Sequence, residues 1–298
     1  MGKIVPYLWF NNQAEEAVKL YTSIFNNSKI SNISYYEDAG EEVSGMKSGS
    51  VMSLDFEIDG QEFIALNGGP VFSFTPAISF FINCGTKEEV DYLWHKLSYG
   101  GSVLMELDEY AFSKRFGWLQ DKFGVNWQLS LGSGNQKINT FFMFTGDNYG
   151  KAEEAMKFYT SIFKNSTIRE IHRYEEGDES LKGKVNRAIF SLQGQDFMII
   201  DSNFNHNFNF TEAISLFVKC EDQAEVDELW DRLTEDGEEI QCGWLKDKYG
   251  ISWQIVPTLL GQLLDSDDSV RSNRVLKEMF KMKKIEIAKL QQAYDNEE

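Results

Sequence analysis

The sequence predicts an α+β protein in which one module of about 130 residues occurs twice in a single chain. Residues 14–30 (AEEAVKLYTSIFNNSKI) and residues 152–168 (AEEAMKFYTSIFKNSTI) are identical at thirteen of 17 positions. Average composition gives about one identity by chance over such a length. In both halves, short apolar runs typical of strands alternate with amphipathic segments typical of helices. The chain is therefore a tandem duplication of mixed helix-and-strand units.

Each copy begins with a short apolar run, residues 4–10 in the first copy and 138–144 in the second, which predicts a strand buried on both faces. An amphipathic helix follows, and Asn12 with Glu15 resembles a capping box at its start. Apolar residues spaced i, i+4, i+7 and i+8 form the buried face of this helix. In the two copies they are Ala17, Tyr21, Ile24 and Phe25, and Ala155, Tyr159, Ile162 and Phe163.

Three further strands are expected after this helix, over residues 29–37, 51–58 and 62–66. Asp59-Gly60 is a strong hairpin signal between the last two, and Gln193-Gly194 takes its place in the second copy. Residues 77–84 then begin another unit, whose helix is predicted to start at Thr86 with Glu89 and to be followed by three strands ending near residue 131. The order strand, helix, three strands therefore occurs twice in each copy.

The repeat also sets the expected domain boundaries. The first module covers residues 1–132, the short flexible stretch GSGNQ follows, and the second module covers residues 137–258. The second copy lacks most of the segment around residues 107–115, which we expect to be a hairpin extension or a loop. Residues 259–298 break the repeat and have helical periodicity, so we expect a C-terminal extension of one or two helices docked on the second copy.

Charge and composition limit the partners that the surface can bind. The formal net charge is −18, from 47 acidic and 29 basic side chains, which disfavours nucleic acid and anionic lipid as partners. The sequence has no apolar run of membrane-spanning length and no layout of a secretory signal at its start. Cys84 and Cys220 occupy equivalent places in the two copies, which indicates packing roles for reduced thiols. We therefore expect a cytoplasmic protein.

Two motifs carry a resemblance to a known family. A helix of the form A-E-E-A-x-x-x-Y-x-x-x-F and an ending of the form G-W-x-x-D-K-[FY]-G-x-x-W-Q both occur twice. With the tail over residues 282–294, they resemble the PhnB-like, demethylubiquinone methyltransferase-like branch of the vicinal oxygen chelate superfamily, which also contains glyoxalases and bleomycin-resistance proteins. The resemblance implies two tandem modules, each with two βαβββ units in a curved, mostly antiparallel sheet of eight strands whose concave face forms a cup for ligand.

The resemblance also implies where a metal would be bound. In metal-using members, His or Gln on the first strand, His on the fifth and Glu on the eighth hold a divalent ion. Those positions correspond to Val5, Ala77 and Gln128 in the first copy and to Asn139, Ala213 and Gln254 in the second. Valine and alanine cannot coordinate a metal, so we expect no metal and no cofactor in either cup. The histidines at 95, 172 and 206 are interpreted as solvated or locally hydrogen-bonded.

Strand alternation, placed on this fold, predicts the residues that line the cups. They are Tyr7, Trp9, Ser79, Phe81, Trp118 and Gln128 from the first copy, and Asn139, Phe141, Ser215, Phe217, Trp244 and Gln254 from the second. An apolar concavity with a few polar groups is the usual form of a small-molecule site, but the same aromatic residues could simply fill the cups as core. Trp118 and Trp244 could close the rim or pack on the edge of the sheet. Trp127 and Trp253 should pack beneath the second helix of each copy, and Asp121 and Asp247 are interpreted as turn residues before a glycine, in preference to acid/base groups.

The sequence favours a metal-independent small-molecule-binding protein whose ligand it does not identify, and it predicts no catalytic residue. The alternatives are an enzyme of the superfamily with a non-standard metal site and a methyltransferase, as the name of the branch suggests. The sequence carries no G-x-G-x-x-G between a strand and a helix to bind a nucleotide-like cofactor. A duplicated chain can imitate a dimer internally, so a monomer, a homodimer or one purely structural copy remain open.

Overall fold

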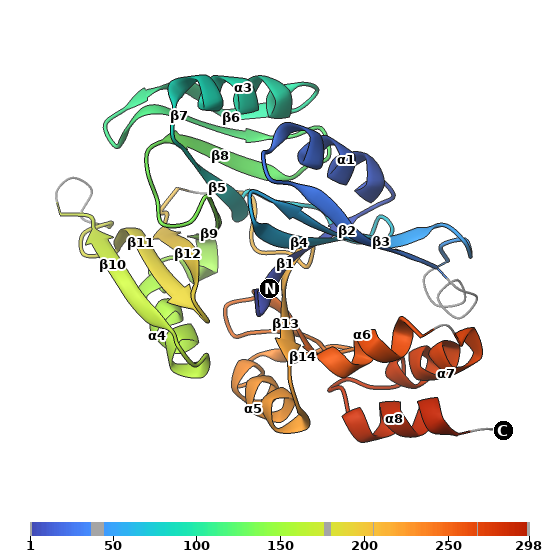
Figure 1. Ribbon diagram of the computed structural model, residues 1–298. Helices are drawn as coiled ribbons and strands as arrows, with labels where there is room; N and C mark the ends of the chain where they lie inside the picture. The colour runs from blue at the N-terminus through green and yellow to red at the C-terminus, as the bar shows by residue number, and fades with distance from the viewer. Residues whose placement is uncertain (1, 37–44, 176–179, 205, 267, 297–298) are drawn as a thin grey trace.

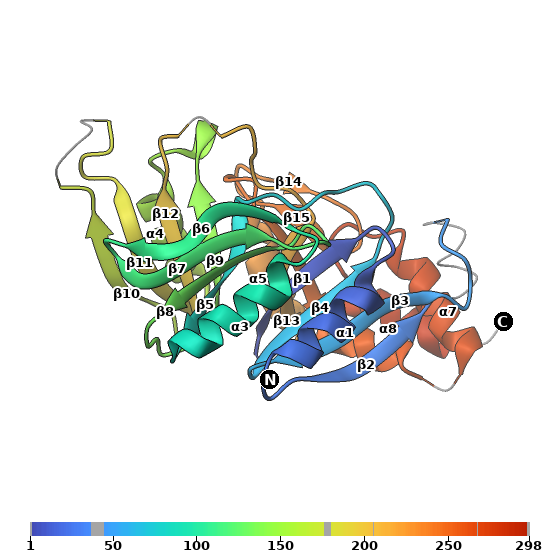
Figure 2. The ribbon, with the colours of Figure 1, turned by 90° about the horizontal axis from the view of Figure 1, so that it is seen from above.

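The computed structural model describes residues 2–36, 45–175, 180–204, 206–266 and 268–296, and its overall arrangement is shown in Figures 1 and 2. In this part of the chain, the strands form two mixed sheets of eight strands each. The predicted α+β class with two eight-stranded sheets is confirmed. No helix in the described ranges is both long enough and apolar enough to cross a membrane.

Sheet A has the spatial strand order β14-β15-β16-β13-β1-β4-β3-β2. Its strands are β1 (Ile4–Phe10), β2 (Lys29–Tyr35), β3 (Val51–Ile58), β4 (Gln61–Asn67), β13 (Ile214–Cys220), β14 (Glu238–Glu239), β15 (Trp244–Lys246) and β16 (Ser252–Pro257). Glu37, the last residue of the strand predicted over 29–37, lies outside the described residues.

Sheet B has the spatial strand order β10-β11-β12-β9-β5-β8-β7-β6. Its strands are β5 (Ile78–Cys84), β6 (Ser102–Tyr110), β7 (Ser113–Gln120), β8 (Asn126–Leu131), β9 (Ile138–Phe144), β10 (Thr167–Arg173), β11 (Val185–Leu192) and β12 (Gln195–Asp201). The segment missing from the second copy belongs to the long β6–β7 hairpin, which confirms the predicted hairpin extension.

Each sheet combines one half of the first copy with one half of the second, which differs from the expectation of one sheet for each copy. The first strand β1 pairs antiparallel with β13, so that Tyr7 lies opposite Ser215. In sheet B, β5 pairs with β9 in the same way, and Ser79 lies opposite Phe141. Strands β5 and β13 have equivalent sequences in the two copies. Strand β1 can therefore pair in the same way with the strand of its own copy or with that of the other copy.

The two units of one copy contact each other through their helix-covered faces. The helices α1 (Ala14–Ile24) and α3 (Lys87–Ser98) belong to the first copy, and α4 (Ala152–Ile162) and α5 (Gln223–Leu233) with the short 3₁₀ helix η1 (Gly146–Asn148) belong to the second. Trp127, which is 1% exposed, lies 5.1 Å from the ring of Tyr21 on α1 and 5.3 Å from that of Phe80 on β5. Trp127 is buried as predicted, but the helix aromatic residues that its ring contacts, Tyr21 and Phe25, belong to the first helix of the copy and its end, and not to the second helix. This core closes each copy and leaves the free edge of β1 to be completed by the other copy.

The start of α1 differs from the predicted capping box. The helix begins at Ala14, and no side chain of its N-cap residue Gln13 bonds to the first turn. Instead, the side-chain oxygen of Asn67 on β4 accepts a hydrogen bond from the Ala14 backbone N–H at 2.9 Å. A partner from the neighbouring strand satisfies one of the free N–H groups at the helix start and fixes the helix on the sheet.

The C-terminal extension forms the helices α6 (Thr258–Leu264), α7 (Ser269–Met279) and α8 (Ile287–Asp295). They contain one more helix than the one or two predicted, and they do dock on the second copy. Their apolar residues form a cluster with Val256 on β16, and Phe217 on β13 packs against this cluster. In Figure 1 they lie below the strands of sheet A, at the red end of the chain.

Candidate functional site

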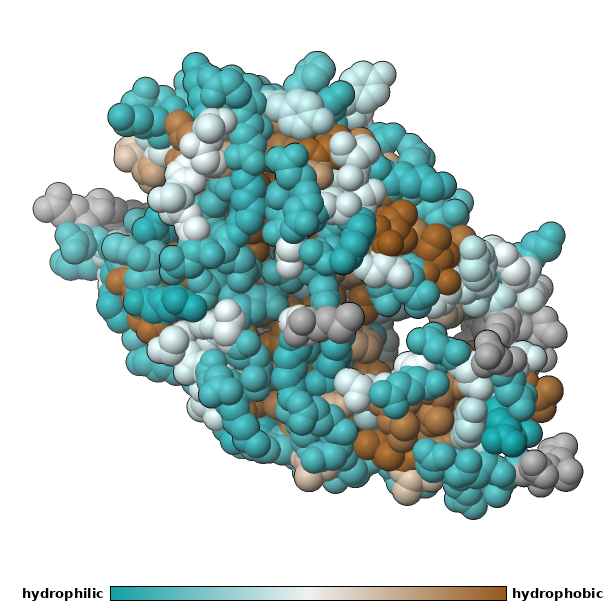
Figure 3. All heavy atoms as spheres, in the orientation of Figure 1, coloured by the Kyte–Doolittle hydropathy of each residue, from teal (hydrophilic) through white to brown (hydrophobic). Residues whose placement is uncertain are grey.

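The concave face of sheet A, which we call cup A, is more open than the face covered by helices. Pairing places Asp55, Ile64, Tyr7 and Ser215 in one row across β3, β4, β1 and β13. Along these strands the helix-side residues are buried, whereas most cup-side residues are only half-buried. The space-filling view is open between the strands of sheet A and the C-terminal helices (Figure 3). The cup-side face of sheet A is therefore less completely buried than its helix side.

Aromatic side chains form one wall of cup A. The ring of Tyr7 stacks on Phe217 at 6.2 Å between centroids and meets the edge of Trp244 at 5.9 Å. Trp9 lies 6.0 Å from Trp244 and 5.0 Å from Phe72, and its indole N–H donates to the Gly69 carbonyl at 2.9 Å. The structure thus brings together Tyr7, Trp9, Phe217 and Trp244, which sequence reasoning had assigned to two separate copies.

Neutral polar groups lie beside this aromatic wall. The Nε2 of Gln254 donates to the hydroxyl of Ser215 at 2.9 Å, and both residues are buried, at 4% and 0% exposed. Among the described residues, none donates to the Gln254 Oε1 or hydrogen-bonds the Tyr7 hydroxyl. Burial raises the pKa of Tyr7, and nearby Tyr36 and Asp55 add to the shift. Tyr7 is therefore a neutral phenol at physiological pH and can donate a hydrogen bond.

The concave face of sheet B, cup B, is filled to a greater extent. Phe141, Met143 and Met198 form a buried cluster there, against which Phe81, Trp118 and Phe208 pack. Gln128 donates to Ser79 at 2.8 Å, as its counterpart does in cup A, and Asn139 is also buried, at 4% exposed. Of the two interpretations that the sequence left open, the geometry of cup B resembles the filled core.

Trp118 and Trp244 lie on the concave faces rather than beneath a helix. Trp118 pairs with Gln128 on β8, and Trp244 pairs with Gln254 on β16, so each tryptophan stands beside the glutamine of its cup. The indole N–H of Trp118 is buried and has no hydrogen-bond partner among the described residues. Such an unpaired donor lowers stability unless a ligand or a water molecule accepts its hydrogen bond.

Because the sheets are exchanged, the positions equivalent to metal ligands combine in a new way. Val5 and Ala213 stand with Gln254 in sheet A, and Asn139 and Ala77 stand with Gln128 in sheet B. Val5, Ala77 and Ala213 are at most 1% exposed and have no atom that can bind a cation. In the described ranges, no three His, Cys, Asp or Glu side chains lie close enough together to hold a metal ion.

The three histidines lie in different parts of the molecule. His95 lies on α3, and His172 lies on β10 at 3.7 Å from Glu170. The ring of His206 lies 3.1 Å from the hydroxyl of Ser202 and stacks on Phe208, and burial lowers its pKa. None of these arrangements brings two histidines to the centre of a cup.

Asp121 and Asp247 form a duplicated buried cluster on the helix side, remote from the cups. Each accepts two backbone N–H bonds within its own turn, which confirms the turn interpretation. Each also accepts from a tryptophan at 2.8 Å and from a helix tyrosine, Tyr21 at 2.6 Å or Tyr159 at 2.7 Å. Burial raises the pKa of both carboxyls, that of Asp247 to about 6. Sequence reasoning missed this cluster, although the repeated Tyr and Trp were visible signals.

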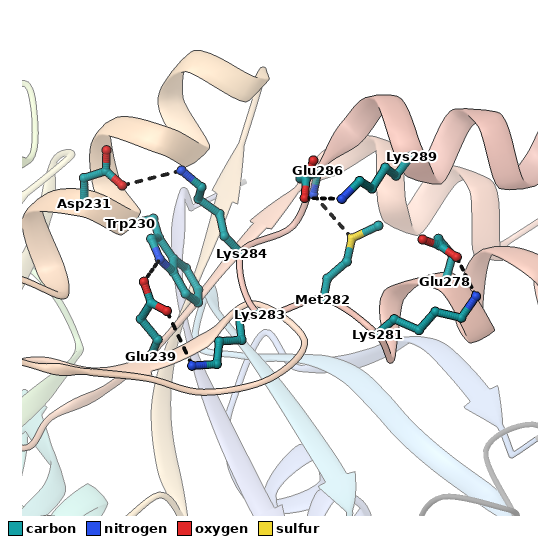
Figure 4. A pocket seen from close by; sticks show the side chains of 10 residues that line it. All are labelled: Trp230, Asp231, Glu239, Glu278, Lys281, Met282, Lys283, Lys284, Glu286 and Lys289. Atoms are coloured by element: carbon teal, nitrogen blue, oxygen red, sulfur yellow. Dashed lines mark hydrogen bonds and ion pairs between the residues drawn. The ribbon is translucent and has the colours of Figure 1, made fainter.

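A separate hollow of about 330 Å³ lies between α5, β14 and the C-terminal helices (Figure 4). Four lysines line it, and each is paired with a neighbouring carboxylate. The pairs are Lys281 with Glu278 at 2.8 Å, Lys283 with Glu239 at 3.6 Å, Lys284 with Asp231 at 3.5 Å and Lys289 with Glu286 at 2.6 Å. The charges are balanced within the hollow, and none of the residues predicted to bind ligand lies there. The pairs of Lys283 with Glu239 and of Lys284 with Asp231 attach the C-terminal extension to β14 and α5, and the other two pairs lie within the extension.

The fold and the cups define the class of protein. Paired strand-helix-three-strand units that build two eight-stranded sheets are the vicinal oxygen chelate fold, here in tandem duplicate. Glyoxalase I from Zea mays has this fold at a TM-score of 0.54, with 11% identity over 84% of this chain and 92% of that one. At this level of identity the likeness concerns the fold alone.

Sequence comparison then gives the family. The sequence model of the family described as 3-demethylubiquinone-9 3-methyltransferase matches residues 2–130 and 136–256, and the chain belongs to that family. A putative 3-demethylubiquinone-9 3-methyltransferase, PhnB protein, from Bacillus cereus is 44% identical over 44% of this chain and 100% of that chain, with a TM-score of 0.41. A protein from Staphylococcus aureus is 36% identical over 45% of this chain and 98% of that chain, with a TM-score of 0.19. No curated protein matches the chain.

Proposed function

We propose that this chain binds a small molecule in cup A and does so without a metal ion. The observation that carries the proposal is the half-buried aromatic wall of Tyr7, Trp9, Phe217 and Trp244 beside the neutral pair Ser215 and Gln254. Small-molecule sites are concave and mostly apolar, with a few polar groups that fix orientation. Val5 and Ala213 stand where metal-using relatives place their first-strand and fifth-strand ligands.

Cup A is the better candidate of the two. Its Tyr7 and Trp9 are replaced in cup B by Phe141 and Met143, so cup B lacks the phenol donor. Apolar side chains already bury Phe141 and Met143 in cup B, whereas Tyr7 and Trp9 are half-buried. The Tyr7 hydroxyl and the Gln254 carbonyl oxygen supply one donor and one acceptor for a ligand that stacks against Phe217 and Trp244.

Calorimetry and thermal-shift screening with aromatic metabolites and antibiotics test this proposal. A ligand of cup A should bind Tyr7→Phe about five- to tenfold more weakly, since a hydrogen bond contributes about 1 kcal/mol. The matched cup B variant Met143→Leu should bind it as the wild type does. Elemental analysis should find no stoichiometric metal in the purified protein. Stoichiometric nickel, zinc, iron or manganese would contradict the metal-free site.

A second candidate comes from the description of the family, which is that of a methyltransferase. Incubation with S-adenosylmethionine carrying a labelled methyl group and a demethylated quinol tests it directly. Transfer of label that depends on Tyr7 or Gln254 would favour an enzyme over a binding protein.

We also propose a cellular location and an assembly state for the protein. Three cysteines, none of them in a disulfide, support a reducing compartment such as the cytoplasm. The exchanged sheets support an internal pseudo-dimer that is either a monomer or a homodimer in solution.

A further inference from the structure

Cup A contains a carboxylate without a direct partner. Asp55 lies on β3, opposite Ile64 of β4, which in turn lies beside Tyr7 of β1. Two strand spacings separate Asp55 from Tyr7, a distance of about 10 Å across the sheet. In the described part of the chain, Asp55 makes no side-chain hydrogen bond and no ion pair.

The charges around Asp55 do not neutralise it. Lys219 is a nearby cation, but its ammonium group is bound to Glu62 at 2.7 Å. Desolvation by burial raises the pKa of Asp55, Asp265 and Glu62 add to the shift, and Lys219 opposes it. Burial is thus the main cause of the raised pKa, and the attraction of Lys219 does not offset it.

The duplication supplies an internal control for the role of Asp55. Strand β11 of the second copy pairs with β10 and β12 in the same register, and Ile189 occupies the position of Asp55. The strand thus forms equally well with an apolar side chain there, and no structural contact requires the carboxylate. A half-buried, unpaired charge lowers stability, so its presence calls for an explanation outside the fold.

We propose that cup A selects ligands that join a planar ring to a protonated amine, with the ring against Tyr7, Phe217 and Trp244 and the ammonium group on Asp55. This inference rests on the proposed function and adds the chemical class of the ligand. A protonated amine donates charge-assisted hydrogen bonds to a carboxylate, and aromatic faces attract cations as well as rings.

Three probes of similar shape and different charge test the inference: naphthylmethylamine, naphthylmethanol and naphthoate. Titration calorimetry and quenching of tryptophan fluorescence should show that the amine binds the wild type about tenfold or more tightly than the alcohol, and that naphthoate binds most weakly. In Asp55→Asn and Asp55→Ile, the affinity for the amine should fall to that for the alcohol, which itself should not change. Ile is the residue of the second copy, so the latter variant keeps the strand.

The control variant Glu235→Gln removes the same charge from an exposed site outside sheet A and should keep the preference for the amine. Trp244→Leu should weaken the amine and the alcohol alike, because both rings lie in cup A. Equal affinity for amine and alcohol, or an amine affinity unchanged in Asp55→Asn, overturns the inference and leaves the proposed function standing. Absence of binding by all three probes overturns the inference and leaves the proposed function to the wider screen. Full affinity of Trp244→Leu for the amine and the alcohol contradicts ring binding in cup A and overturns the inference and the proposed function together.

Discussion

Substitution of one buried tyrosine tests whether the duplicated carboxylate clusters stabilise the fold. Tyr159 on α4 is 1% exposed and donates to the Oδ2 of Asp247 at 2.7 Å. Tyr159→Phe removes this donor and little volume. Hydrogen bonds to charged groups contribute about 1.5 to 3 kcal/mol, so we expect a loss of about 2 kcal/mol in the free energy of unfolding at pH 8. The equivalent Tyr21→Phe should cost a similar amount, because its bond to Asp121 has nearly the same length.

The pH dependence of this loss follows from the carboxyl group. Asp247 has a pKa of about 6 in the fold against an ordinary value of 3.8, so its protonated form favours the folded state and that stability is lost as the pH rises from 3.8 through 6. The bond from Tyr159 lowers this pKa, and its removal raises the pKa further. The variant should therefore lose more stability than the wild type between pH 5.5 and pH 8, and the cost of the substitution should grow with pH.

Urea unfolding followed by tryptophan fluorescence at the two pH values measures both effects. Tyr99→Phe, at a side chain 78% exposed, is the matched control and should change stability by less than about 0.5 kcal/mol. A cost for Tyr159→Phe that equals the control, or one that shrinks as the pH rises, would refute this account of the cluster.

Three more predictions concern the cup, the extension and the exchanged sheets. A Cβ on Gly68 would lie 2.2 Å from the ring of Trp9, so Gly68→Ala should displace that ring and shift the tryptophan emission. The substitution should lower the free energy of unfolding by about 1 to 3 kcal/mol. An unchanged emission spectrum would contradict this packing. Deletion of residues 259–298 should expose Phe217 and lower the free energy of unfolding by about 2 kcal/mol for each large apolar side chain that becomes exposed. The deletion should also increase binding of a hydrophobic dye, and unchanged dye binding would contradict the contact. A chain of residues 1–132 alone should form a dimer by light scattering, because β1 of one copy can pair with β5 of another, and a stable monomer would show that the halves can close on themselves.

Most of the fold could be predicted from the sequence because the duplication doubles every signal. Strand β1, the hairpin at Asp59-Gly60 and the helix start at Thr86 lie where patterning placed them. Pairing between copies could not be predicted, since the strands of both copies carry equivalent patterns and no local rule distinguishes partners of the same sequence type. For the same reason, the sequence assigns the lining residues of cup A to two different cups, one in each copy.

The sequence predicts which residues share a face of each sheet, but not how the two faces differ. Alternation along the strands places Tyr7 and Trp9 on one face of their strand, because the face of a side chain depends only on period two. The isolation of Asp55 depends on where Lys219 and Glu62 meet, which is a matter of side-chain contacts across three strands. The helix contact of Phe217 depends in turn on how the C-terminal extension folds back.

The pairing of Ile4 with Val218 has a consequence for biosynthesis. Strand β1 is synthesised about 210 residues before its partner β13, so one of its edges has no permanent neighbour until β13 has been made. Until then its edge is exposed to the same strand of other nascent chains, which is a hazard for aggregation. Contacts so distant in sequence also slow the final closure of the sheet. The covalent link between the two copies keeps the correct partner close by and limits competition from other molecules.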